Sequence, residues 1–142
     1  MLDGLPPGLA LDEAAIATEM ARRAPGQNAL STARKESDMV EIQSGFFNGF
    51  TTGTPLCARI VNSDQHSKDY SILADKMRPG HADYAGHVRY QGFNDYRGGG
   101  HFSGRLTAPL VFAGAVAKQA LAQYGIIVGS HILQINDIKE ER

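Results

Sequence analysis

The sequence is poor in several features whose absence limits what the chain can be. It has one cysteine, Cys57, and no tryptophan among 142 residues. A single thiol cannot close an intramolecular disulfide, so we expect a protein of the reducing cytoplasm. No apolar run approaches the roughly 20 residues that cross a bilayer, and the first residues lack the basic start and apolar core of a signal peptide. We therefore expect no membrane partner.

An excess of either charge is missing as well. Fourteen Lys and Arg oppose fifteen Asp and Glu, which gives a formal net charge of -1. This balance argues against a nucleic-acid partner, because such proteins use a basic surface to displace counterions. The five histidines match no compact ligand spacing, so we expect no metal site. A Gly-x-Ser-x-Gly elbow, which would indicate a Ser-His-Asp hydrolase, is absent too.

The pattern of apolar residues predicts a mixture of helices and strands. Asp12 is a plausible N-cap and Pro25-Gly26 a stop signal, which bound the first helix. The expected helices cover 12–24, 82–91 and 106–124, and the expected strands cover 40–47, 54–61 and 126–135. Turn formers at 48–53 predict an antiparallel hairpin between the first two strands. Long polar stretches at 27–38 and 62–80 and a glycine-rich stretch at 92–100 are predicted loops.

These elements indicate the α+β class. The helix over 106–124, with Thr107 as its cap, is apolar on nearly every side, which is typical of burial between layers. We predict one domain over residues 1–142, built from an antiparallel hairpin, this long buried helix and the strand that follows it. Both ends of the sequence look cut from something longer; ordinary frayed termini are the alternative.

The sharpest chemical feature is the run 97–105, which leads directly into the long helix. Three consecutive glycines let successive amides face one point, and a helix N-terminus adds unpaired N–H groups. Ser103 contributes a hydroxyl, and Arg97 and Arg105 contribute guanidiniums that suit phosphate or carboxylate. The run predicts an anion site, most naturally for phosphate. A flexible glycine loop before a helix is the competing interpretation.

The second feature is a turn that presents His81 at its tip. A histidine there can transfer protons near neutral pH, and Asp83 can orient it; an ordinary surface histidine is the bland alternative. From Arg78 to Arg105 there are four arginines and three histidines against two acids. That concentration of positive charge favours a small, multiply anionic ligand over a polymer.

The motifs together resemble the chorismate synthase family. The residues that carry the resemblance are Arg78-Pro-Gly-His-Ala-Asp-Tyr84, Asp95-Tyr-Arg-Gly-Gly-Gly100, Ser103-Gly-Arg105 and Arg22-Arg23-Ala-Pro-Gly26. It extends, in order, over essentially the whole chain. The resemblance implies conversion of 5-enolpyruvylshikimate 3-phosphate to chorismate by an anti-1,4-elimination of phosphate, with reduced FMN as cofactor. It also implies a β-α-β sandwich, present here only in part, and a homotetramer.

The resemblance also implies roles for individual residues. His81 matches the catalytic histidine beside the flavin. The substrate-binding positions are Arg23, Arg78, Ser103 and Arg105. Arg23 is also associated with NADPH in members that reduce their own flavin, although helix dipole and solvent alone can explain an arginine at a helix end.

The FMN-binding positions of the family fall on His101, Phe102 and Ser103. One common family pattern, Arg-Ser-Ser-Ala-Arg-Glu-Thr, here becomes His-Phe-Ser-Gly-Arg-Leu-Thr over 101–107. At His101 and Phe102, side-chain contacts with FMN are therefore expected to change, whereas backbone contacts with FMN are expected to persist. Ala29 also stands where some relatives carry an arginine.

Family chains are longer than this sequence. A Gly-Glu-Ser-His-Gly segment with another catalytic histidine is expected before Leu2, and a large C-terminal portion supplies further contacts and an essential aspartate. We therefore expect an incomplete domain that does not turn over substrate alone. Two alternatives stay open: a non-catalytic module that keeps the anion site, and a fragment that folds only with complementary chain.

Overall fold

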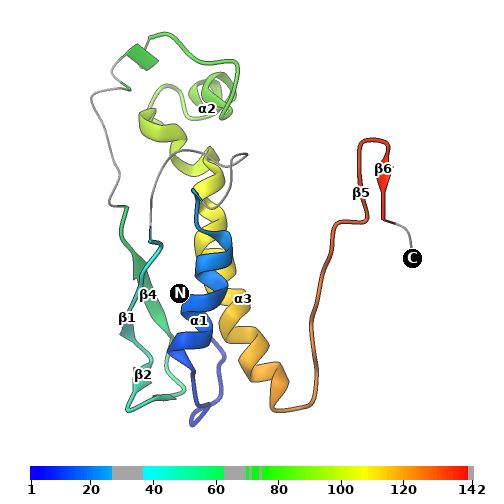
Figure 1. The fold of residues 1–142 in the computed structure, drawn as a ribbon. Helices are drawn as coiled ribbons and strands as arrows, with labels where there is room; N and C mark the ends of the chain where they lie inside the picture. The colour runs from blue at the N-terminus through cyan, green and yellow to red at the C-terminus, as the bar shows by residue number, and fades with distance from the viewer. Residues whose placement is uncertain (27–36, 63–69, 71, 74, 141–142) are drawn as a thin grey trace.

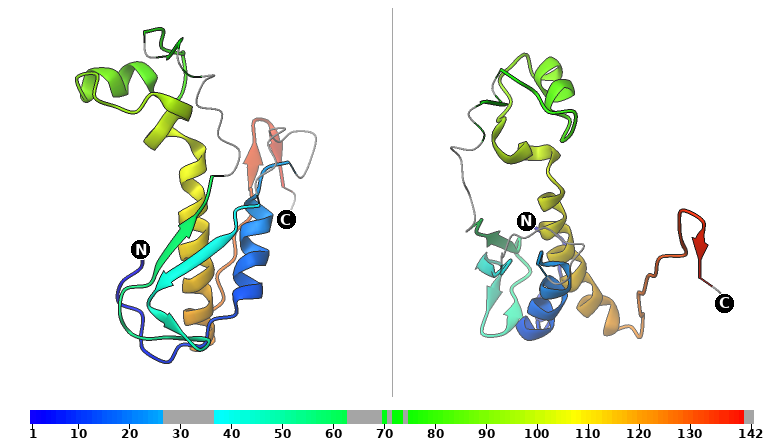
Figure 2. Two further views of the ribbon diagram at one scale, coloured as in Figure 1. Left: turned by 90° about the vertical axis from the view of Figure 1, so that its left-hand side faces the viewer. Right: turned by 45° about the horizontal axis from the view of Figure 1, so that its top comes forward.

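The computed structural model describes residues 1–26, 37–62, 70, 72–73 and 75–140. Its body consists of two helices, α1 (Glu13–Arg23) and α3 (Thr107–Ala122), that lie side by side with a β-hairpin across them (Figures 1 and 2). The core between these layers is formed by nine buried apolar side chains: Leu9, Leu11, Ile16, Met20, Leu56, Ala108, Phe112, Ala115 and Val116. The mixed α+β class is confirmed, with three α-helices and small two-stranded antiparallel sheets in the described residues.

Helix α1 forms where the local signals predict it. The Asp12 carboxylate accepts a hydrogen bond from the Ala15 amide at 3.0 Å and so caps the first turn. Ile16 and Met20, one turn apart, are the buried residues of the helix. Gln119 of α3 fixes the start of α1, because its side chain bonds both the amide and the carbonyl of Asp12, at 2.8 and 3.0 Å.

The predicted hairpin is confirmed, and it has two parts. Its long arms are β1 (Val40–Ser44) and β4 (Cys57–Ile60), antiparallel with Val40 opposite Ile60. Its tip is formed by β2 (Phe46–Phe47) and β3 (Phe50–Thr51). The predicted connector 48–53 is therefore too long, because Phe50 and Thr51 pair as a strand. Between the parts, Gly45 has φ of 77° and approaches Leu56 so closely that a Cβ would lie 2.6 Å from its Cα, so only glycine fits.

The segment that precedes α3 is more regular than predicted. Helix α2 (Asp83–Arg89) confirms the expected helix near 82–91. The glycine triplet, expected in a loop, forms part of the 3₁₀ helix η2 (Arg97–Phe102), and a second 3₁₀ turn, η3 (Gly104–Leu106), joins it to α3. Thr107 does not cap α3 as expected: it is the first helical residue, and its hydroxyl donates to the Gly104 carbonyl at 2.7 Å.

Two predictions about the C-terminal half are wrong. Helix α3 is buried on one face only, and Leu110 on the opposite face is 71% exposed. The strand expected over 126–135 is reduced to β5 (Gln134–Ile135), which pairs with β6 (Ile138–Lys139) away from the body (Figure 2). Apolar composition alone does not make a strand, because a strand needs a neighbour for its backbone hydrogen bonds. Ile127, in this apolar run, is 95% exposed.

Candidate functional site

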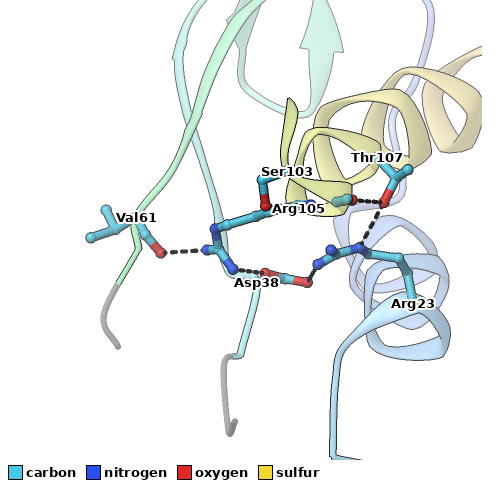
Figure 3. Close-up of polar contacts among 7 residues, drawn as sticks. Arg23, Asp38, Val61, Ser103, Arg105 and Thr107 are labelled. Carbon is cyan, nitrogen blue, oxygen red and sulfur yellow. Dashed lines mark hydrogen bonds and ion pairs between the residues drawn. The ribbon is translucent and has the colours of Figure 1, made fainter. Parts of the chain in front are cut away.

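Two arginines from different elements converge on one buried acid at the start of α3 (Figure 3). Arg23, in the last turn of α1, pairs through Nη1 with Oδ2 of Asp38, and Arg105, in η3, places its Nη1 3.4 Å from Oδ1. The Asp38 side chain is fully buried, whereas the side chains of Arg23 and Arg105 are 20% and 23% exposed. The three side chains sum to one net positive charge at the edge of the body, which favours an anion.

Further hydrogen bonds tie this arginine cluster, Arg23, Asp38 and Arg105, to its surroundings. Arg23 Nε donates to the Thr107 hydroxyl at 3.3 Å, and Arg105 Nη2 donates to the Val61 carbonyl just after β4, also at 3.3 Å (Figure 3). The cluster therefore joins α1, the hairpin and the start of α3. Each arginine has two polar contacts outside its own helix or turn, which limit the positions its guanidinium can take.

Ser103 stands beside the cluster and supports the local backbone. Its hydroxyl accepts a hydrogen bond from the Arg105 amide at 3.2 Å and caps the short turn η3. This contact orients the turn that carries Arg105. The structure thus places Ser103 and Arg105 close to Arg23, three of the four residues expected at the substrate.

A cavity of about 610 Å³ opens next to this site. Its polar lining includes Arg97, Ser103 and Arg105. Much of the rest is apolar and comes from the N-terminal segment, β4 and α3: Leu2, Ala58, Ile60, Ala108, Leu110 and Phe112. A cavity lined by both guanidiniums and apolar side chains suits a ligand that combines a phosphate with a ring system.

Arg78 and His81 lie in a second group around the start of α2. Arg78 holds Asp83 with three hydrogen bonds: Nε and the amide donate to Oδ2 at 2.8 and 3.1 Å, and Nη2 donates to Oδ1 at 3.1 Å. These bonds lower the pKa of the Asp83 carboxyl, and the same pairing raises the pKa of Arg78. Both carboxylate oxygens of Asp83 therefore accept hydrogen bonds from Arg78. The expectation that Asp83 orients His81 is corrected accordingly.

His81 instead lies against the glycine triplet. It adopts φ of 52°, and a Cβ placed on Gly99 would come within 2.7 Å of the imidazole Cδ2. The structure thereby joins the two chemical features that the sequence singled out, the His81 turn and the glycine-rich run. The side chain of His81 remains exposed, so its imidazole can exchange protons with a ligand or with solvent.

Local acids offset part of the positive charge that the sequence concentrates over 78–105. Arg97 forms a bidentate pair with Asp95, both hydrogen bonds being 2.8 Å, and this pairing lowers the pKa of Asp95 to about 2. Arg78 is matched by Asp83 in the same way. The net positive charge of the candidate site therefore rests on the arginine cluster.

The three expected FMN positions face different surroundings. Ser103 lines the 610 Å³ cavity. Phe102 packs over Gly86 of α2, where a Cβ would lie 2.6 Å from its ring, and its ring centroid is 6.4 Å from that of Tyr90. It lines a smaller cavity of about 130 Å³ beside α2. The His101 side chain is exposed.

Sequence reasoning missed Asp38. It sits at the end of a polar stretch predicted to be a loop, and no motif distinguishes it from other acids. Its left-handed backbone and its burial between two arginines appear only once α1, β1 and α3 are packed together. Among the described residues, no group of three or more His, Cys, Asp or Glu side chains gathers as metal ligands would.

Comparison with known proteins shows the family to which this chain belongs. A family model described as chorismate synthase matches residues 1–142, and the chain belongs to the chorismate synthase family. A chorismate synthase from Cytophaga hutchinsonii is 50% identical over 139 residues, 98% of this chain and 38% of that protein. One from Polaromonas sp. strain JS666 is 54% identical over 139 residues, 97% of this chain and 38% of that protein.

A solved structure extends the comparison to three dimensions. A crystal structure of chorismate synthase superposes with a TM-score of 0.68 at 30% identity, covering 97% of this chain and 34% of that one. The chain thus spans about 38% of the length of the curated relatives it matches. Within the described part of the chain, no helix has both the length and the hydropathy that crossing a membrane requires.

Proposed function

We propose that this chain forms the phosphate-holding part of a chorismate synthase, a phosphate-eliminating lyase that converts 5-enolpyruvylshikimate 3-phosphate to chorismate. The observation that carries the proposal is the convergence of Arg23 and Arg105 on Asp38, with Arg105 also lining a partly apolar cavity. Both residues lie in motifs of the family to which the chain belongs. Ser103 and Arg78 complete the substrate-binding set.

The arginine cluster suits the chemistry of this elimination. As the C–O bond to the phosphate breaks, its electron pair and a growing negative charge pass to the departing phosphate. Fixed guanidiniums stabilise that charge with little reorganisation, because Arg23 and Arg105 are already held by neighbouring elements. The net positive charge of the cluster therefore stabilises the transition state more than the bound substrate, because negative charge accumulates on the departing phosphate.

The reaction also releases a hydrogen from the ring, and we assign to His81 the proton transfer that manages the protonation of the flavin. Its exposed imidazole lies against Gly99 in η2, the 3₁₀ helix that leads through η3 to the phosphate site. An imidazole can accept a proton and later return it near neutral pH. Such a group ends each catalytic cycle in the protonation state in which it began, as a catalyst must.

The cavity lining fits reduced FMN. When bound, reduced FMN supplies transient electron density to the breaking C–O bond. Ser103 and Arg105 at the polar end would hold its phosphate or that of the substrate, and the apolar walls from β4 and α3 would face its ring. His101 and Phe102 would contribute backbone contacts, and Arg23 would meet NADPH if the protein reduces its own flavin.

The assembly we propose for the whole protein is the β-α-β sandwich and homotetramer of the family, acting in the cytoplasm. The apolar run that follows α3 supports this proposal, because it includes Ile127, which is 95% exposed. Such surfaces are normally covered by further structure.

Ligand binding tests the function. We expect the chain to bind 5-enolpyruvylshikimate 3-phosphate in isothermal titration calorimetry at least about a hundredfold more tightly than 5-enolpyruvylshikimate, which lacks only the phosphate. Arg105→Gln should remove most of that preference, whereas Arg59→Gln, on the exposed face of the hairpin, should retain it. Equal affinity for the two ligands would contradict the proposal.

A further inference from the structure

Asp38 is a buried acid to which the proposed reaction gives no role. Its side chain has no exposed surface, and its backbone adopts the left-handed region with φ of 47°. Residues other than glycine seldom adopt that region, and they do so where the surrounding structure determines it. The fold therefore fixes the position of this carboxylate just before β1.

The carboxylate of Asp38 bridges two cations, Arg23 and Arg105, that are far apart in the sequence. Oδ2 pairs with Arg23, while Oδ1 lies 3.4 Å from Arg105 Nη1 (Figure 3). Oδ1 is buried and accepts no hydrogen bond within the described residues. A buried carboxylate oxygen in that condition is costly, and here the nearby guanidinium charge offsets the cost. The contact with Arg105 is thus an electrostatic one that depends on the negative charge of Asp38.

This geometry decides how far apart the two guanidiniums lie. Like charges repel strongly where water is largely excluded, so Arg23 and Arg105 alone would tend to separate. The carboxylate between them offsets that repulsion. Each guanidinium is also held by a hydrogen bond to a partner other than Asp38, from Arg23 to Thr107 and from Arg105 to the Val61 carbonyl.

We propose that Asp38 is a positioning residue: it holds Arg23 and Arg105 at one spacing, so that both guanidiniums meet the same phosphoryl group. The inference rests on the proposed function, because it concerns the same anion site. A simple counter-ion would have the opposite effect, since it would compete with the bound anion. Removal of the negative charge therefore weakens anion binding if Asp38 positions the arginines and strengthens it if Asp38 only neutralises them.

The substitution Asp38→Asn separates these two effects. Asparagine keeps the shape of the side chain and tolerates the left-handed backbone. We expect the affinity of the full chain for inorganic phosphate, measured by calorimetry at low salt, to fall about tenfold or more despite the added positive charge. An unchanged or higher affinity in the folded variant overturns the inference.

Glu41→Gln is the matched control. Glu41 also pairs with an arginine, Arg59, at 2.7 Å, but on the exposed surface of the hairpin. The substitution removes the same charge from the protein without touching the arginine cluster. Phosphate affinity should stay within about twofold of the unsubstituted chain.

A second measurement needs no ligand. The Nε–Hε NMR signals of Arg23 and Arg105 should report rigid side chains in the unsubstituted protein and mobile ones in Asp38→Asn. If the unsubstituted chain fails to bind phosphate, the proposed anion site is wrong, and arginine mobility alone decides the role of Asp38. Arginine signals that stay equally rigid in Asp38→Asn overturn that role.

Asp38→Glu keeps the inference testable if Asp38→Asn does not fold. The glutamate retains the charge but moves it by one methylene. We expect weaker phosphate binding and displaced arginine signals, because spacing rather than charge has changed. Phosphate affinity equal to that of the unsubstituted chain would overturn the positioning role.

Discussion

The imidazole of His81 lies against Gly99, so close that a Cβ on Gly99 would come within 2.7 Å of its Cδ2. Gly99 also has φ of 84°, which disfavours any side chain. A glycine is therefore required there for two independent reasons. The proximity of His81 and the glycine-rich run depends on it.

We expect Gly99→Ala to displace His81 and to destabilise the chain by about 1 kcal/mol or more. Thermal unfolding would measure the loss, and the NMR signals of the imidazole ring would report the displacement. Gly104→Ala is the control, since a Cβ there meets nothing within 4 Å. If Gly99→Ala leaves the His81 signals in place, the contact is not the constraint we infer.

The Thr51 hydroxyl should be important for stability. It is buried, accepts a hydrogen bond from the Leu9 amide at 3.0 Å and donates one to the Pro6 carbonyl at 2.6 Å. Thr51→Val leaves both partners unsatisfied, and we expect a loss of about 1–3 kcal/mol in chemical denaturation. The exposed Thr54→Val should change stability by less than about 0.5 kcal/mol. Similar effects of the two substitutions would be evidence against this role for Thr51.

The Asp95–Arg97 pair makes a prediction about pH. The folded pKa of Asp95 is lowered from 3.8 to about 2, chiefly by side-chain hydrogen bonds from Arg97. Because the pKa is lower in the folded state, the pair stabilises the fold above about pH 4 and loses that effect as the pH falls through about 2. A carbon-13 NMR titration of the Asp95 carboxyl should give a midpoint near 2.

Arg97→Gln provides the comparison for that titration. Without the guanidinium, the midpoint of Asp95 should rise toward the ordinary value of an aspartate. A midpoint that stays near 2 in this variant would show that another group lowers the pKa.

The sequence predicts well where the signals are local. Asp12 caps α1, and the spacing of Ile16 and Met20 determines which face of the helix is buried. The cap and the two apolar residues all lie within one short segment of the sequence. The strand predicted over 126–135 is wrong because strand formation depends on a partner, which composition does not specify. The turn predicted over 48–53 wrongly includes Thr51 for the same reason, because the pairing of Thr51 with Phe46 is set by the hairpin register.

The site divides in the same way. Arg105, Ser103 and His81 lie in compact motifs, so the sequence alone is enough to predict a role for each of them. Asp38 has no such motif, and its importance comes from contacts with residues far along the chain. Folding also reveals that Arg78 is matched by Asp83, which sequence reasoning assigned to His81.

The most direct test of the account is whether Arg23 and Arg105 act on one anion. A double-mutant cycle would compare the phosphate affinities of Arg23→Gln, Arg105→Gln and the double variant with that of the unsubstituted chain. Each single substitution should weaken binding about tenfold, and the coupling energy should reach about 1 kcal/mol, because the second substitution removes little that the first has left. Fully additive effects, or phosphate affinity that neither substitution changes, would contradict a shared site.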